Sequence, residues 1–161
     1  MTNNALKQYI RMLIENESFD NWVMPDDKAI ELEYNVEYKH HTRYSFGDIF
    51  PTVEDFKEAV HSGKQVKLTK EMDRRVGNRS RTSDMEDLRD LVSSYRSWPK
   101  YRNDETLQAI VDGFKSGSAM KMPFILEYEP GRQQVMSGNT RLDIAYMLGI
   151  TPTVIVIKGY K

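Results

Sequence analysis

The first 63 residues hold three stretches with a regular hydrophobic pattern. Apolar side chains at the spacing i, i+3, i+4, i+7 and i+8 predict an amphipathic helix over residues 4–16. Apolar and polar residues alternate strictly from Ile30 to Tyr38, which is typical of a strand with one buried face. A second helix is predicted after its cap, Thr52, and is expected to end near Gly63. The pattern thus indicates a helix, a strand and a helix in this order.

Short strands and helices also alternate along the rest of the chain. Ser83 and Glu86 have the spacing of a capping box, and Gly117 and Gly149 are expected to end two later helices. In chain order we expect a strand at 65–69, a loop at 70–82, helices at 83–96 and 104–117, strands at 122–128 and 133–136, a helix at 140–148 and a strand at 153–157. This order predicts an α+β fold, a small mixed sheet with packed helices. Residues 1–63 are expected to form an extension packed on a core domain of residues 64–161.

Composition narrows the class of protein. Hydrophobic residues make up 39% of the chain and charged residues 29%, which favours a folded domain over a disordered chain. The absence of cysteine excludes disulfides, thiolate metal sites and cysteine nucleophiles. No apolar stretch of 18 residues and no signal-peptide pattern is present, so we expect a cytoplasmic protein without a membrane partner. We expect no zinc site either, because His40 and His41 are adjacent and no matching ligand pair lies nearby.

Charge is distributed unevenly, although the formal net charge is only -1. Residues 15–37 contain eight acidic residues and one lysine, whereas residues 64–81 contain seven basic and two acidic residues. Opposed charge blocks often mark a polarised surface. The acidic block is a candidate docking surface for a protein partner.

The strand predicted at 133–136 runs through Ser137 and Gly138 directly into a helix that begins at Asn139, Thr140 and Arg141. The unpaired amides of a first helical turn and the helix macrodipole together favour an anion at such a junction. Ser137 and Thr140 add hydroxyls, Asn139 an amide and Arg141 a planar fork of donors that matches phosphate oxygens. The stretch Ser137–Arg141 therefore predicts a phosphate site. The alternative is that Ser137 or Asn139 merely caps the helix while Arg141 faces water.

The chain from about Val66 to Lys158 resembles the ParB/sulfiredoxin-like superfamily. The motifs that carry the resemblance are a helix ended by Gly117, a strand with Pro123 near its start, a hairpin return strand, the Gly-x-x-Arg helix start at Gly138–Arg141, and a closing apolar strand. The resemblance implies that a nucleotide phosphate lies against Gly138, Asn139, Thr140 and Arg141. Because the superfamily is functionally divergent, it implies a fold more directly than an activity.

The branches of the superfamily differ at the residues around this glycine. Sulfiredoxins have cysteine and histidine where this chain has Asn139 and Thr140, so sulfinic acid reduction is excluded. The glutamate and arginine of ParB partition proteins are also missing, which argues against partition-type DNA clamping. The free serine kinases are more similar at Gly138, Thr140 and Arg141, but have aspartate and histidine in place of Ser137 and Asn139. Phosphoryl transfer using ATP or another nucleotide with magnesium is what this similarity implies.

Family loops after the first core strand often contact substrate, which draws attention to the basic stretch at 70–81. Glu71 and Asp73 are candidates for a general base or a magnesium ligand. Candidate contacts to a triphosphate or a nucleic-acid backbone are Arg74, Arg75, Arg79, Arg81 and, before the helix at 104, Arg102. The alternative for the whole stretch is a solvated loop.

Two classes of function remain open from the sequence. One is a phosphotransferase or nuclease acting on a nucleotide or nucleic acid. The other is a non-catalytic regulatory module that binds DNA or protein, as in phage DNA modification or host takeover. The loss of the family's charged residues at Ser137 and Asn139 favours the second class, whereas the basic stretch suits both.

Overall fold

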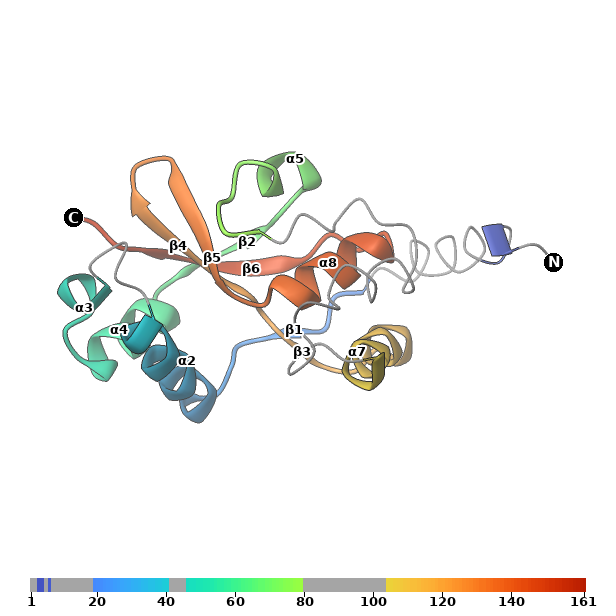
Figure 1. Cartoon of the computed structure of the whole chain (residues 1–161), viewed down its shortest axis with the longest axis horizontal. Helices are drawn as coiled ribbons and strands as arrows, with labels where there is room; N and C mark the ends of the chain where they lie inside the picture. Colours follow the sequence, from blue (N-terminus) through green and yellow to red (C-terminus); the bar gives the residue numbers. More distant parts are fainter. Residues whose placement is uncertain (1–2, 5, 7–18, 41–45, 80–103) are drawn as a thin grey trace. The chain divides into compact units, whose positions relative to one another are not determined.

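The structure, a computed structural model, describes residues 3–4, 6, 19–40, 46–79 and 104–161 (Figure 1). It confirms the expected α+β class. The chain divides into two units, and each is considered by itself. Unit 1 takes its described residues from 1–22, 80–120 and 139–152, and unit 2 consists of 23–79, 121–138 and 153–161.

A four-stranded mixed sheet forms the centre of unit 2. Its order is β2 (Lys64–Lys67), β6 (Thr153–Lys158), β4 (Phe124–Glu129) and β5 (Arg132–Ser137). β6 runs antiparallel to β2 and parallel to β4, and β4 and β5 form an antiparallel hairpin, drawn in orange in Figure 1. The hairpin turns at Gly131, whose φ of 75° suits glycine. The strands and the turn expected in this half of the chain are confirmed.

The strand expected from Ile30 to Tyr38 is wrong, because these residues belong to α2 (Asp27–His40). Ile30 and Tyr34 are buried and lie on one face of this helix, whereas Leu32 and Val36 are 60% and 51% exposed. The same apolar residues fit a period of two and, in part, the helical spacing i, i+4. A side-chain oxygen of Asp26 accepts a hydrogen bond from the Ala29 amide at 2.8 Å, which caps the helix start.

The second predicted helix is confirmed as α4 (Val53–His61). Thr52 is its cap, and the Thr52 hydroxyl and the Asp55 carboxylate form a reciprocal capping box. A short helix, α3 (Phe46–Ile49), precedes it in a stretch where the sequence pattern predicts no element.

Aromatic side chains hold α2, α3 and α4 together and against the sheet. Phe56 on α4 is fully buried, and its ring lies 6.3 Å from that of Phe124 on β4. The Tyr34 hydroxyl donates a hydrogen bond to the Phe50 carbonyl at 3.0 Å, so this buried polar group is satisfied. The helices of the expected extension therefore belong to the same unit as the sheet. The domain boundary after residue 63 stays a prediction.

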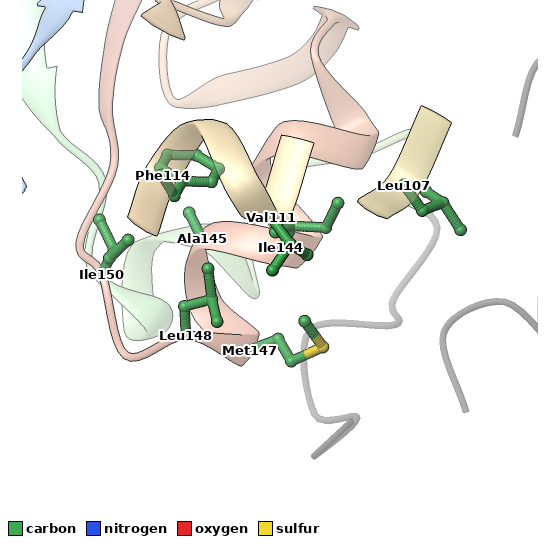
Figure 2. Packing of buried hydrophobic residues seen from close by; sticks show 8 residues of the cluster. All are labelled: Leu107, Val111, Phe114, Ile144, Ala145, Met147, Leu148 and Ile150. Atoms are coloured by element: carbon green, nitrogen blue, oxygen red, sulfur yellow. The ribbon is translucent and has the colours of Figure 1, made fainter. Parts of the chain in front are cut away.

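Unit 1 is built around α7 (Asp104–Ser116) and α8 (Asn139–Met147). Figure 2 shows their packing, in which eight buried residues contribute: Leu107, Val111, Phe114, Ile144, Ala145, Met147, Leu148 and Ile150. Phe19 and Trp22 pack edge-on against Phe114, with ring centroids 4.9 and 5.5 Å away. Both helices were expected at these positions.

β1 (Trp22–Val23) and β3 (Met120–Lys121) form a two-stranded sheet. Most of the helix expected at 4–16 and all of the helix expected at 83–96 lie outside the described residues; Asn3, Asn4 and Leu6 are helical. Within the described ranges, none of the helices has the length and apolar character that crossing a membrane requires.

Candidate functional site

A single glycine joins β5 to α8 at the expected phosphate site. β5 ends at Ser137, α8 begins at Asn139, and Gly138 between them has a φ of 97°. Residues with a Cβ atom rarely adopt this conformation, so the turn requires glycine. The abrupt change from strand to helix predicted at this position is confirmed.

The first turn of α8 has the electrostatic character of an anion site. Its amides have no partners within the helix, and the macrodipole places about half a positive charge there. No acidic residue lies in this turn to compete for the amides. Thr140 and Arg141 are half-buried, which leaves part of each side chain accessible. The turn can therefore bind an anion through backbone amides, a hydroxyl and a guanidinium.

Asn139 and Arg141 each already take part in an interaction within the chain. An incoming phosphate would therefore meet two residues that already have partners within the chain.

The core of unit 1 holds this helix start in place. Beyond Arg141, each residue of α8 from Leu142 to Met147 is buried. The buried stretch includes Asp143, whose exposure is 0%. A buried carboxylate is rare and needs a partner, and Asp143 does interact within the chain. The sequence pattern gave no signal for this buried carboxylate.

The basic stretch of unit 2 contains α5 (Lys70–Asp73), a short helix capped by Thr69, where a loop was expected. Asp73 lies at its end and forms an ion pair with Arg79, with 2.7 Å between Arg79 Nε and Asp73 Oδ1. The two side chains are only 6% and 2% exposed. Asp73 is therefore engaged as the partner of a buried guanidinium. Its assignment as a catalytic group stays a prediction.

Backbone hydrogen bonds fix the stretch that follows α5 against β5. Gly77 donates to the Gln133 carbonyl at 2.9 Å and accepts from the Val135 amide at 3.0 Å. The Asn78 side chain donates to the Val135 carbonyl at 3.2 Å, and Asn78 has a φ of 58°. Gly77 therefore pairs with the edge of β5 as a residue of a neighbouring strand would, so this part of the stretch is not a solvated loop.

The other candidates in the basic stretch face the solvent. Arg74 is exposed, and Glu71 and Arg75 are 86% and 74% exposed with 4.0 Å between their charged atoms. Such a contact leaves Arg75 accessible to a phosphate. These residues belong to unit 2, and Asn139–Arg141 to unit 1. Two further candidates, Arg81 and Arg102, lie outside the described residues.

In the part of the chain that the structure describes, no group of three histidine, aspartate or glutamate side chains is placed to hold a metal ion. Glu71 and Asp73 accordingly do not form a three-residue cluster of this kind with described neighbours. His41 lies outside the described residues.

Comparisons with protein-family models, with curated proteins and with solved structures find no match to this chain.

Proposed function

We propose that the start of α8 and the glycine before it bind a phosphate group of a nucleotide or a nucleic acid. One observation carries the proposal: β5 ends at Ser137, Gly138 turns the chain at a φ of 97°, and α8 begins at Asn139 with no acid in its first turn. The resemblance of Gly138–Arg141 to the ParB/sulfiredoxin-like superfamily supports the same ligand.

Each residue has a distinct role in this proposal. The amides of the first turn of α8 bind the phosphate oxygens, and the Thr140 hydroxyl adds a donor. Arg141 supplies the charge and a bidentate fork. Ser137 and Asn139 contribute a hydroxyl and an amide next to them. Gly138 is needed for the turn and for the close approach of the ligand to the backbone.

We extend the proposal to two reactions: phosphoryl transfer with ATP or another nucleotide and magnesium, or phosphodiester cleavage with magnesium. Glu71 or Asp73 would then have to lie within about 3 Å of a reacting group or of its metal. Glu71 is exposed and free to move, whereas Asp73 is held by Arg79. Of the two, Glu71 therefore fits the role of base better.

A non-catalytic module is the second candidate function. It is favoured by the ion pair that occupies Asp73 and by Ser137 and Asn139, which stand where the kinases of the superfamily have charged residues. As such a module, the protein binds a nucleotide or DNA in the cytoplasm without turnover. Its role would be in DNA modification or in the takeover of a host cell by a phage. A protein partner would dock on its acidic block, residues 15–37.

The test is calorimetric titration of the full chain with ATP, ADP, CTP, GTP and a short DNA duplex, each with and without magnesium. Arg141→Ala should abolish the saturable signal, and Arg141→Lys, which retains charge but not the fork, should weaken it by about tenfold. Arg132→Ala is the matched control, because Arg132 is 69% exposed and forms a surface ion pair with Glu129 at 3.6 Å.

Thermal melts of each variant establish that the fold is retained. Equal binding by wild type and Arg141→Ala would contradict the proposal, and Gly138–Arg141 would then be an ordinary helix start that binds no ligand. Binding that depends on Arg141, followed by turnover that Glu71→Gln abolishes, would favour the enzyme over the module.

A further inference from the structure

A pocket of about 590 Å³ lies on the sheet of unit 2, and this volume is in the range of small-molecule sites. In the strand register, Lys64 on β2 lies opposite Val156 on β6, and Lys158 on β6 lies beside Glu127 on β4. Residues two apart on a strand share a face of the sheet. Lys64, Val66, Val156 and Lys158 therefore share the face on which the pocket opens.

The floor of this pocket is apolar. Val66 and Val156 are half-buried on the sheet, and Leu68 and Met72 line the wall where β2 leads into α5. Leu68 is 1% exposed, so the wall is continuous with the interior. An apolar body placed here would cover the exposed parts of the two valines and gain the free energy of their burial.

The rim of the pocket is positively charged. Lys64 and Lys158 are exposed, and among the described residues no ion pair is formed by either ammonium group. The single carboxylate, Glu127, accepts hydrogen bonds from the Tyr160 hydroxyl at 2.6 Å and from Gln133 Nε2 at 3.0 Å. These hydrogen bonds lower the pKa of the Glu127 carboxyl and keep it ionised, and one carboxylate against two ammonium groups leaves the rim with a net positive charge.

Lys64 and Lys158 differ in their surroundings. The Lys158 ammonium lies over the Tyr160 ring, 4.6 Å from its centroid, and is close to the charge of Glu127. Lys64 is on β2, with β6 between it and Glu127 on β4, which corresponds to about 10 Å. Lys64 is therefore the cation that is farther from the carboxylate and the better partner for an anionic group.

We propose that this pocket binds a small amphipathic anion: an apolar body of one or two rings on Val66 and Val156, with a carboxylate or phosphate head at Lys64. The positive charge of the rim favours an anionic ligand, and the apolar floor favours a ligand with an apolar ring system. Lys158 contributes a weaker, longer-range attraction. The pocket lies at the hairpin end of the sheet, and Gln133 beside it is four residues, or about 13 Å of strand, from Ser137. None of the residues that line the pocket belongs to Ser137–Arg141, so this proposal does not rest on the proposed phosphate site.

The test is titration of the ¹⁵N-labelled full chain with three probes, followed by amide shifts in NMR spectra. The probes are 2-naphthoate, 2-naphthyl phosphate and the uncharged 2-naphthalenemethanol, which have the same apolar rings. Both anions should shift the amides of Val66, Val156 and Gln133, and the alcohol should bind about fivefold more weakly than the naphthoate. The anion that binds more tightly identifies the head group.

Variants of the lysines make the test specific. Lys64→Gln should weaken binding by about fivefold and Lys158→Gln by about twofold. Lys67→Gln is the matched control, because Lys67 is on the same strand but points to the opposite face of the sheet. Val66→Phe should fill the pocket and abolish binding.

Three results would overturn the proposal. The first is the absence of shifts at these amides with millimolar probe. The second is an equal effect of Lys64→Gln and Lys67→Gln. The third is a set of shifts centred on Asn139–Arg141, which would place the anion at the start of α8 instead.

Discussion

Asp73 and Arg79 show at the residue scale how one buried ion pair can shape a basic stretch. The pair is closed from solvent, whereas Glu71 and Arg75 four residues apart on the surface are open to it. Removing one partner of a buried pair leaves an uncompensated charge, which costs far more than losing an exposed contact. The same two types of residue therefore have different roles within one short segment.

The first prediction follows from this contrast. Asp73→Asn should lower the free energy of unfolding by about 3 kcal/mol because it leaves Arg79 buried without its counter-ion. In urea unfolding, the double variant Asp73→Asn/Arg79→Met should lose less than the sum of the single variants. Glu71→Gln is the exposed control and should leave the urea midpoint unchanged. A stability of Asp73→Asn equal to wild type would show that the pair does not hold this segment.

Glu37 gives a second prediction, on pH dependence. Burial, together with the neighbouring charge of Glu33 and a hydrogen bond to it, raises the pKa of the Glu37 carboxyl from 4.5 to about 8. The folded state thus binds a proton that the unfolded state has released between these two pH values. The contribution of Glu37 to stability is complete below about pH 4.5 and is lost as the pH rises to about 8.

Glu37→Gln should remove this loss, since glutamine carries no charge to bury. The difference in unfolding free energy between variant and wild type should grow from pH 4.5 to pH 8 by up to a few kcal/mol, at about 1.4 kcal/mol for each pKa unit. Glu58→Gln, at an exposed position of α4, is the control. Parallel pH curves for wild type and Glu37→Gln would contradict the prediction.

At the scale of elements, α2 leads to a third prediction. A strand would have placed Ile30 and Leu32 on one buried face, whereas the helix buries Ile30 and leaves Leu32 60% exposed. Ile30→Ala should therefore lower the free energy of unfolding by about 3 kcal/mol, and Leu32→Ala by less than about 0.5 kcal/mol. Chemical denaturation of the two variants is the measurement. Similar losses of unfolding free energy in both variants would contradict the helix and support a strand that buries Ile30 and Leu32 on one face.

Elements with strong local end signals were predictable from the sequence. Thr52 and Asp55 form the capping box of α4, and the change from strand to helix at Gly138 was also expected. α2 was not predictable in this way, because the spacing of its apolar residues fits both a strand and, in part, a helix. Its packing against α4 decides between the two. The local signal for α5 was weaker still, since only Thr69 marks its start.

The candidate site divides in the same way. Ser137–Arg141 are neighbours in sequence, so their grouping at a helix start needed only the local pattern. The hydrogen bonds between Gly77 and β5 and the pocket beside Lys64 depend on long-range contacts. The pairing of Asp73 with Arg79 depends on the path of the chain after α5, which brings two residues six positions apart together. Single-sequence periodicity carries no information on such contacts.

At the scale of the whole molecule, charge decides between the two kinds of phosphate ligand. The formal net charge is -1, so general attraction to a nucleic acid is absent and binding must depend on local basic residues. Arg74 and Arg75 are exposed in unit 2. A single nucleotide would rely on the amides of α8, whereas a nucleic acid would also neutralise several phosphates with arginines.

Salt dependence therefore makes the last prediction. If DNA is the ligand and three phosphates are contacted, the Kd should rise roughly 40-fold between 50 and 200 mM salt, and Arg75→Glu should flatten this slope by about one phosphate equivalent. A nucleotide bound mainly by the first turn of α8 should respond less to salt and be indifferent to Arg75→Glu. Fluorescence anisotropy with labelled duplex and labelled nucleotide measures both slopes. A steep slope that Arg75→Glu leaves unchanged would remove Arg75 from the interface, because basic residues elsewhere on the protein would then neutralise the phosphates.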